Sequence, residues 1–365
     1  MSSRSRHGAG RFAPRRLLAQ FNERFPCPSA YCVAFSGGLD STVLLHALAS
    51  VRDALRAPLS AVHVDHALQP GSADWMRHCG QQCRQLDVPL QALVVDAAAR
   101  RGESPEAAAR TARYQAMAAV LDARTMLLTA HHLDDQAETL LLQLLRGAGV
   151  DGLAAMPAVR AWHRGWHARP LLGWQRAALR AWAVAGRLHW IEDPSNTQTA
   201  ADRNYLRHRV LPALHARWPA AAINIAQSAG LCAEAAESVR RQAEQDLASV
   251  RSDDRQCLRL AALCDLPPGA ASQVLRRWLR ERGAPPLPRR RLLAALEQLC
   301  GARSGAAVRI AWSGHELRRY RDQAWLVRQA PVSLAPAPLD WSGDAVDLGP
   351  GLGRLRRRLG PGGID

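Results

Sequence analysis

The segment Ala34-Phe35-Ser36-Gly37-Gly38-Leu39-Asp40-Ser41-Thr42 decides the fold that the sequence predicts. The apolar residues at 31–33 indicate a buried strand before it, and the apolar residues at 43–48 recur at helical spacing after it. The Ser-Gly-Gly therefore lies in a strand-to-helix turn. At such a turn the first N–H groups of the helix are unpaired, the helix dipole is positive, and glycines let an oxyanion approach the backbone. The segment thus predicts an anion-binding loop, to which its three hydroxyl side chains add donors.

This loop differs from a Walker A loop, which has a lysine after its second conserved glycine. Here the acidic residue Asp40 follows the glycines. A carboxylate beside a phosphate cradle is explained if Mg²⁺ lies between them, because this hard cation takes carboxylate and phosphate oxygens together. An ordinary glycine turn would explain a bare Gly-Gly. The full Ser-Gly-Gly-Leu-Asp-Ser after a strand is much rarer by chance.

Strands and helices alternate from residue 30 to residue 146. The hydrophobic pattern predicts strands at 30–35, 59–64, 88–96 and 125–130, and helices at 41–55, 72–87, 105–123 and 133–146. Strands separated by helices of this length indicate βαβ crossovers. The predicted fold class is therefore α/β, a parallel doubly wound sheet covered on both faces, in which ligands bind beyond the carboxyl ends of the strands.

Polar residues cluster at two of these strand ends. His63, Asp65 and His66 end the second strand, and His131-His132-Leu133-Asp134-Asp135-Gln136-Ala137-Glu138-Thr139 follows the fourth. One or two acids at a helix N-terminus would be explained by the helix dipole alone. Two histidines followed by three carboxylates, at the edge where the loop also opens, favour a metal and substrate site.

A second domain is predicted after residue 217. Before it, a helix near 175–186 is followed by Arg203-Asn204-Tyr205-Leu206-Arg207-His208-Arg209, which suits a phosphate backbone and an exposed base, or equally an amphipathic helix with a basic outer face. Later patterns indicate a helix at 219–250, two helices within 269–300 and three short strands between 307 and 328. We therefore expect a first domain at 1–217, a smaller helical α+β domain at 218–330, and a linker with the start of a further domain at 331–365.

The composition points to a polyanionic partner. All 48 basic residues are arginine, the formal net charge is +16 and the isoelectric point is near 10.9, which favours nucleic acid over an acidic membrane surface. No apolar run long enough to span a membrane and no signal peptide is evident, so a cytoplasmic protein without a membrane partner is expected. None of the eight cysteines forms a Cys-x-x-Cys, and buried free thiols are expected at Cys79 and Cys83.

The six residues Ser36–Ser41 resemble the PP-loop of the ATP pyrophosphatase family, whose members split ATP between the α and β phosphates and pass AMP to a carbonyl or carboxyl oxygen. The chain resembles the tRNA(Ile)-lysidine synthase family within that group. The resemblance spans about residues 30–215 and rests on that loop together with His63–His66, Arg110–Tyr114, His131–Thr139, Asp193-Pro194-Ser195-Asn196 and Arg203-Asn204. Family members often carry a third, C-terminal domain that helps to hold the tRNA acceptor region, and a truncated C-terminus is one interpretation of residues 331–365.

The resemblance implies a two-step reaction on the wobble cytidine of isoleucine tRNA with a CAU anticodon. ATP adenylates the position-2 oxygen of the base, and the side-chain amine of free L-lysine then attacks that carbon, so that decoding changes from AUG to AUA. ATP binding is expected at Ser36, Gly37, Gly38, Leu39, Asp40, Ser41, His63 and Asp65. Catalytic roles are expected for Asp40, Arg113, Asp134, Asp135 and Glu138, with Mg²⁺ on Asp40 and on Asp135 or Asp134, since spacing does not rank the three carboxylates of the 134–138 segment. Substrate or tRNA contacts are expected for His131, His132, Arg203, Asn204 and Arg207.

Two alternatives stay open at this point. A PP-loop thiolase that installs sulfur on tRNA cytidine is the nearest, although that class usually needs paired cysteines. A tRNA-binding protein without catalytic activity is the alternative of another class. The sequence does not indicate the oligomeric state, the lysine pocket or the means by which methionine tRNA is rejected.

Overall fold

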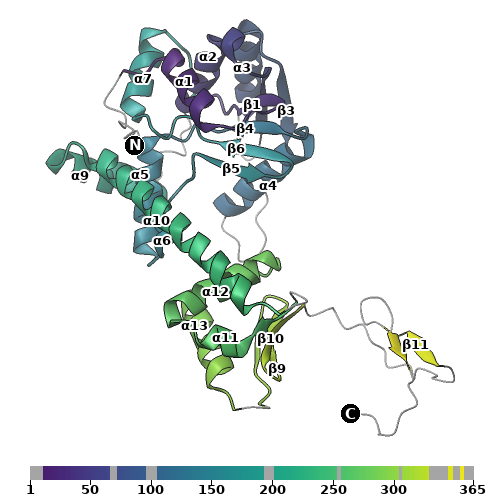
Figure 1. Ribbon diagram of the computed structural model, residues 1–365. Helices are drawn as coiled ribbons and strands as arrows, with labels where there is room; N and C mark the ends of the chain where they lie inside the picture. Colours follow the sequence, from purple (N-terminus) through teal and green to yellow (C-terminus); the bar gives the residue numbers. More distant parts are fainter. Residues whose placement is uncertain are drawn as a thin grey trace, which may run out of the picture. The chain divides into compact units, whose positions relative to one another are not determined.

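The computed structural model describes residues 11–65, 72–95, 105–192, 201–252, 256–303, 306–328, 344–347 and 354–356. Their contacts divide the chain into two compact units, Met1–Ser238 and Val239–Asp365 (Figure 1). None of the helices in these described ranges is long and apolar enough to cross a membrane.

The first unit is built on a six-stranded sheet with the order β3-β2-β1-β4-β6-β5. Its strands are β1 (Ala30–Ala34), β2 (Leu59–Asp65), β3 (Leu90–Val94), β4 (Thr125–Leu128), β5 (Val159–Trp162) and β6 (Gly165–Ala168). All neighbours pair in parallel except β5 and β6, which form an antiparallel hairpin at one edge. The chain moves outward in one direction from β1 to β3 and in the other from β4. The switch point of the sheet therefore lies between β1 and β4, where doubly wound folds bind their ligands.

Helices cover both faces of this sheet (Figure 1). The helices of the unit are α1 (Pro14–Arg24), α2 (Leu39–Ala49), α3 (Ser72–Gln85), α4 (Pro105–Val120), α5 (Leu133–Leu145), α6 (Val150–Leu153), α7 (Arg176–Ala185), α8 (Asp202–Tyr205) and α9 (Leu211–Arg217), with a short 3-10 turn at Arg52–Ala54 and a π-helical turn at Leu206–Val210.

The alternation of side chains along β1 produces two separate apolar layers. Tyr31 and Val33 belong to the large core that also contains residues of α1, α2 and α7. Cys32, between them, points to the opposite face and packs with Met117 of α4 and Leu127 of β4. Successive strand residues face opposite sides of a sheet, so a strand buried on both faces needs apolar residues throughout. This arrangement confirms the α/β fold class with a doubly wound, mostly parallel sheet.

The second unit combines helices with an antiparallel sheet, as expected for the smaller domain. Its core lies between the sheet β7-β10-β9-β8 and the helices α11 to α13, and includes Trp278, Leu275 and Leu317. The elements are β7 (Leu258–Arg259), α11 (Leu260–Cys264), α12 (Pro268–Glu281), α13 (Arg289–Gly301), β8 (Arg309–Trp312), β9 (His315–Tyr320) and β10 (Gln323–Arg328). Helix α10 (Ala221–Val250) spans the division between the units, and β11 (Ala345–Asp347) pairs with β12 (Arg354–Arg356). The domain bounds of 1–217, 218–330 and 331–365 stay a prediction.

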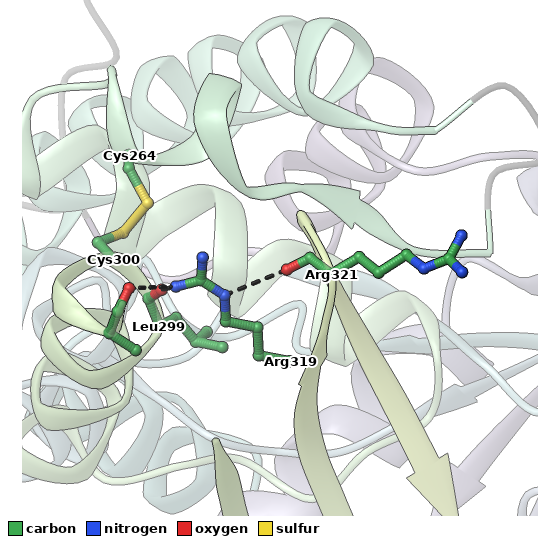
Figure 2. Close-up of a disulfide and its surroundings, with 6 residues drawn as sticks. Cys264, Leu299, Cys300, Arg319 and Arg321 are labelled. Carbon is green, nitrogen blue, oxygen red and sulfur yellow. Dashed lines mark hydrogen bonds between the residues drawn. A yellow bond between two sulfur atoms is a disulfide. The ribbon is translucent and has the colours of Figure 1, made fainter. Parts of the chain in front are cut away.

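A disulfide between Cys264 and Cys300 joins the ends of α11 and α13 (Figure 2). Beside it, Arg319 of β9 donates through Nη1 to the carbonyl oxygens of Leu299 and Ala302, at 2.9 and 2.7 Å. These are carbonyls at the end of α13, which have no partner inside the helix. Cys79 and Cys83, by contrast, are buried free thiols, as the sequence predicts.

Candidate functional site

The loop between β1 and α2 has the geometry of an oxyanion cradle. Helix α2 begins at Leu39 with Gly38 as its N-cap and no side chain capping its first turn. Ser41 Oγ donates to the carbonyl of Gly38 at 3.1 Å and lies 3.1 Å from Ser36 Oγ, so the two hydroxyls border the turn. An exposed hydroxyl at Ser36 and uncapped N–H groups at the start of an eleven-residue helix together offer donors to a phosphate.

Gly37 is required by the shape of this loop. Its φ of +77° lies in the left-handed region, and a Cβ at this position would come within 3.0 Å of Cys79 Sγ. Its carbonyl accepts a hydrogen bond from the N–H of Ile191 at 2.9 Å. Glycine adopts this φ without the steric cost that a side chain would bring, so the turn is fixed by local sequence and by the packing of α3 beneath it.

Asp40 has one carboxylate oxygen engaged and one without a partner. Oδ2 lies 3.7 Å from Nε2 of His132 and 3.5 Å from Nε of Arg176. Oδ1 is buried and has no hydrogen-bond partner among the described residues. Asp134 is held nearby in the network, since its Oδ2 accepts from the backbone N–H of Arg176 at 2.9 Å and lies 3.5 Å from Nδ1 of His132. A buried carboxylate oxygen without a donor is a feature that calls for a ligand.

His132 and Asp135 cap helix α5 reciprocally. The backbone N–H of His132 donates to Asp135 Oδ2 at 2.9 Å, and the backbone N–H of Asp135 lies 3.4 Å from Nδ1 of His132. Burial alone would lower the pKa of His132, but Asp135, Asp134 and Asp40 surround the ring and raise the pKa overall. In the neutral ring with its proton on Nε2, Nδ1 accepts from the backbone N–H of Asp135. In the protonated ring, Nδ1–H faces Oδ2 of Asp134.

Two arginines from the 202–210 region bind the acids of α5. Arg203 reaches Asp135 Oδ1 at 3.0 Å and Glu138 Oε2 at 2.8 Å, and Arg207 reaches Asp135 Oδ1 at 2.9 Å and both oxygens of Glu138. The Glu138 side chain is only 1% exposed. Burial would raise the pKa of Asp135, but His132 and both arginines hold it well below its ordinary range. Two charges of each sign satisfy one another here, which is how buried charges are tolerated.

A second polar network lies at the end of β4 and β6. Thr129 Oγ1 lies 2.9 Å from Nδ1 of His131 and 2.8 Å from Nε2 of His167, while Nη2 of Arg169 lies 3.4 Å from Nδ1 of His167. Burial, together with the charges of Arg169 and Arg203, lowers the pKa of His131 to about 3 despite Asp135. Burial and Arg169 lower the pKa of His167 to about 2. Both rings are therefore neutral at physiological pH.

Two domain models and several curated relatives match the chain. A PP-loop domain matches residues 13–214, and a TilS substrate binding domain matches residues 258–325. The tRNA(Ile)-lysidine synthase of Alkalilimnicola ehrlichii is 45% identical over 90% of this chain and 74% of its own length. That of Methylococcus capsulatus is 44% identical over 96% of this chain and 80% of its own length. The chain belongs to the tRNA(Ile)-lysidine synthase family.

A solved structure of another PP-loop enzyme shares the fold. The U34-tRNA thiolase NcsA from Methanococcus maripaludis, solved with its 4Fe–4S cluster, aligns with a TM-score of 0.51 at 15% identity, over 60% of this chain and 78% of that one. At that identity the similarity shows a shared fold and gives no information on the function of this chain.

The structure brings most of the expected tRNA(Ile)-lysidine synthase site residues to one edge of the sheet. The loop, Asp40, His132 and the acids of α5 are joined by contacts, and so are Arg203 and Arg207. His63 is buried and its Nδ1–H donates to the carbonyl of Phe35 at 2.8 Å, which supports the start of the loop. His66 and residues 193–196 lie outside the described residues.

Three other expected residues lie on β2, α4 and α8. Asp65 is the last residue of β2. Arg113 lies on α4 with its guanidinium 5.8 Å from the ring centre of Tyr114, and Asn204 lies in α8. Their roles stay predictions, as do the individual roles of all the site residues.

Sequence reasoning missed four polar residues of this edge, namely Thr129, His167, Arg169 and Arg176. Arg176 lies at the first position of α7 and meets both Asp40 and Asp134. A single arginine at a helix start carries no local signal of such a role. His167 of β6 and Arg169, the residue after that strand, could have been found only by recognising the strand, whose carboxyl end lies beside that of β4.

The residues present fit a magnesium ion that is shared with ATP. The described residues contain no cluster of three or more metal-ligating side chains. Mg²⁺ at nucleotide sites is usually bound by one or two carboxylates, waters and substrate phosphates. The unpartnered Oδ1 of Asp40, in the first turn of α2 at the end of the phosphate loop, meets that requirement, whereas both oxygens of Asp135 are already engaged by protein donors.

Proposed function

We propose that this protein ligates L-lysine to the position-2 carbon of the wobble cytidine of isoleucine tRNA with a CAU anticodon, in the cytoplasm. The observation that carries the proposal is the contact of Asp40, in the Ser36–Ser41 cradle, with His132 at the start of α5, in a chain that matches the tRNA(Ile)-lysidine synthase family across both of its units. The curated relatives are named for that activity.

The reaction divides into two displacements. The cytosine oxygen attacks the α-phosphorus of ATP. The bond from that phosphorus to the oxygen bridging to the β-phosphate breaks, and pyrophosphate leaves. The neutral side-chain amine of lysine then attacks the position-2 carbon, and AMP leaves with the oxygen. The cradle binds the phosphates that become pyrophosphate, because its hydroxyls and helix N-terminal N–H groups stabilise the charge that develops there. Arg113 is assigned to the α-phosphate.

Asp40 would bind Mg²⁺ through its unpartnered Oδ1. The ion would neutralise charge on the phosphates when it is bound. Arg176 and His132 contact the other oxygen of Asp40, and these contacts fix the orientation of the carboxylate. His63 and Asp65 would contact the nucleotide from the neighbouring strand.

Glu138 is assigned the proton that lysine must lose before its amine can attack. In the structure both oxygens of Glu138 are bound by Arg207, and Oε2 also by Arg203. The ammonium group of lysine would therefore compete with these guanidinium groups for the same carboxylates, Glu138 and Asp135. Displacement of one arginine by the lysine ammonium would free that arginine for the tRNA phosphate backbone, which is the contact assigned to Arg203 and Arg207.

The tRNA is assigned to the second unit and to the arginines around the site. Arg280, Arg289, Arg290 and Arg291 are exposed on α12 and α13, within the region that matches the substrate binding domain. Such residues bind phosphates without reading sequence. Each neutralised phosphate in a single-stranded region contributes about −0.7 to the slope of log affinity against log salt, so tRNA affinity should fall steeply with ionic strength.

Sulfur transfer is less well supported by three buried cysteines of the first unit. Burial raises the pKa of Cys32 to about 11, that of Cys79 to about 12 and that of Cys83 to about 11. Thiols with such pKa values carry little thiolate, which is the form that transfers sulfur or binds metal.

The proposal is tested by measuring the release of AMP and pyrophosphate while each of the three substrates is left out in turn. We expect AMP and pyrophosphate to appear in equal amounts only when ATP, L-lysine and the isoleucine transcript with a CAU anticodon are all present. Pyrophosphate without lysine would indicate the first step alone. AMP release that ignores the tRNA, or no release under any condition, would contradict the proposal.

A further inference from the structure

Four side chains form a continuous chain of polar contacts that begins at a buried charge. Arg169, only 3% exposed, donates from Nη1 to the carbonyl of Pro157 at 2.8 Å and approaches His167 Nδ1 with Nη2 at 3.4 Å. His167 Nε2 lies 2.8 Å from Thr129 Oγ1, which lies 2.9 Å from Nδ1 of His131. The four residues come from the ends of β4 and β6, which pair in parallel.

The chemistry of each group fixes the direction of these hydrogen bonds. A guanidinium only donates, so Nδ1 of His167 accepts from Arg169. A neutral imidazole with one accepting nitrogen carries its proton on the other, so Nε2–H of His167 donates to Thr129. The hydroxyl of Thr129 is buried, and within the described residues its oxygen is bonded only to these two rings. Its hydrogen therefore goes to Nδ1 of His131, because a buried hydroxyl that did not donate would lose a hydrogen bond.

Burial, with the guanidinium groups around it, keeps His131 neutral. Asp135 faces it from α5, and Arg169, Arg203 and Arg110 face it from the other elements packed around it. Burial and the three guanidinium groups outweigh the single carboxylate. A neutral His131 that accepts at Nδ1 must carry its proton on Nε2.

We propose that Arg169, His167 and Thr129 are positioning residues that hold His131 as the neutral Nε2–H tautomer, so that it presents a hydrogen-bond donor to the reacting nucleotide. His131 is half-buried, and its Nε2 has no partner in the part of the chain that the structure describes. The group it binds is then an acceptor, such as a carbonyl or phosphate oxygen, and is not the ammonium of lysine. That His131 binds the reacting nucleotide rests on the proposed function. The assignment of its tautomer is independent of that function.

Nuclear magnetic resonance of the full chain, labelled with ¹⁵N at its histidine rings, tests the tautomer directly. His131 and His167 are assigned by the signals lost in His131→Asn and His167→Gln. We expect Nδ1 to be unprotonated and Nε2 to be protonated in both residues. A protonated Nδ1 at His131 in the wild-type protein overturns the proposal.

Variants separate positioning from packing. In Thr129→Val, which keeps the shape and removes the hydroxyl, His131 should become a mixture of tautomers, while Thr129→Ser should restore the wild-type signal. Arg169→Met should disturb His167 and His131 together. The matched control is Arg160→Met, which removes an exposed arginine of the same hairpin that is not in the chain of contacts. Unchanged tautomers in Thr129→Val, or changed ones in Arg160→Met alone, would refute the relay.

The effect on ligation completes the test. Thr129→Val should lower kcat/KM for lysine incorporation about tenfold, the size expected for one lost hydrogen bond to a charged group or transition state, and Thr129→Ser should recover it. Failure of the wild-type protein to incorporate lysine would count against the proposed function alone, because the spectra decide the tautomer without any substrate.

Discussion

Arg207 donates to both carboxylate oxygens of Glu138, from Nε at 2.7 Å and from Nη2 at 3.0 Å. This bidentate pair joins the turn at Leu206–Val210 to the first turns of α5, and Arg203 reinforces it from one helical turn earlier. A basic run that looked like an outer, phosphate-binding surface therefore also stabilises the acids of the site.

The first prediction concerns that pair. Arg207→Ala leaves the buried Glu138 with Arg203 as its remaining partner, and removal of one member of a buried ion pair costs about 3 kcal/mol or more. We expect amides in the first turns of α5 to lose about that much protection in native-state hydrogen exchange. Arg209→Ala, an exposed arginine two residues away, is the control and should change protection by no more than about 0.5 kcal/mol. Equal protection in both variants would show that the pair does not stabilise the site.

The second prediction concerns the shape of the phosphate loop. Gly37→Ala places a side chain at φ +77° and within 3.0 Å of Cys79 Sγ, with a strain of about 1–3 kcal/mol. We expect ATP affinity, measured by calorimetry, to fall at least about tenfold, the factor that corresponds to about 1.4 kcal/mol. Gly149→Ala is the control, because its φ is −77° and its Cβ would meet nothing within 4 Å. Wild-type affinity in Gly37→Ala would contradict the cradle.

The third prediction is a loss of stability in acid. His167 and His131 have pKa values lowered to about 2 and 3, below the ordinary 6.5. Between these values and 6.5 the unfolded chain binds more protons than the folded one, so stability falls as pH is lowered through that window, by about 1.4 kcal/mol per pH unit for each histidine. Protection of amides in β4 and β6 should fall accordingly between pH 6.5 and 5. His167→Gln should have a shallower slope, and an identical slope would show that the ring is not held neutral.

The fourth prediction concerns the disulfide. Cys264 and Cys300 are 36 residues apart in sequence, and a closed loop of that size is worth about 4 kcal/mol by the chain-entropy account. We expect Cys264→Ser with Cys300→Ser to lower the protection of amides in α11 and α13 by about that amount. Cys232→Ser, at a free and half-buried cysteine, is the control. Peptide mapping without reductant checks that the bond is formed. Unchanged protection of α11 and α13 in the double variant would contradict a structural role of the disulfide.

Much of the first unit could be predicted from the sequence because its signals are local. The glycine turn before α2 and the acids at the start of α5 lie within single segments, and the observed strands β1, β2, β3 and β4 fall within a few residues of the predicted ranges. The β5–β6 hairpin was missed because its turn has His163 at φ +49° where a glycine or asparagine would have signalled it. In the structure, Gly165 of that hairpin lies so close to the backbone of β4 that a Cβ would overlap the carbonyl oxygen of Thr125. The sequence alone does not reveal this close approach.

The site contacts that could not be predicted join residues far apart in sequence. Arg207 and Glu138 are 69 residues apart, and Thr129 and His167 are 38 apart. Nothing near Arg203 or Arg207 distinguishes an arginine that binds phosphate from one that pairs with a buried acid. Likewise, Arg169 has no neighbouring acid in the sequence, and its role depends on the pairing of β4 with β6.

The central claim is that the phosphate loop and the acids of α5 join lysine to one cytidine of isoleucine tRNA. The most direct measurement is the incorporation of radiolabelled L-lysine into a CAU isoleucine transcript, followed by digestion to nucleosides and mass analysis of the wobble position. We predict label on that cytidine alone, none in elongator methionine tRNA with the same anticodon, and none with Asp40→Asn, which should still bind tRNA because the lost charge serves the metal. Label elsewhere in the tRNA, or near-normal incorporation by Asp40→Asn, would contradict the account.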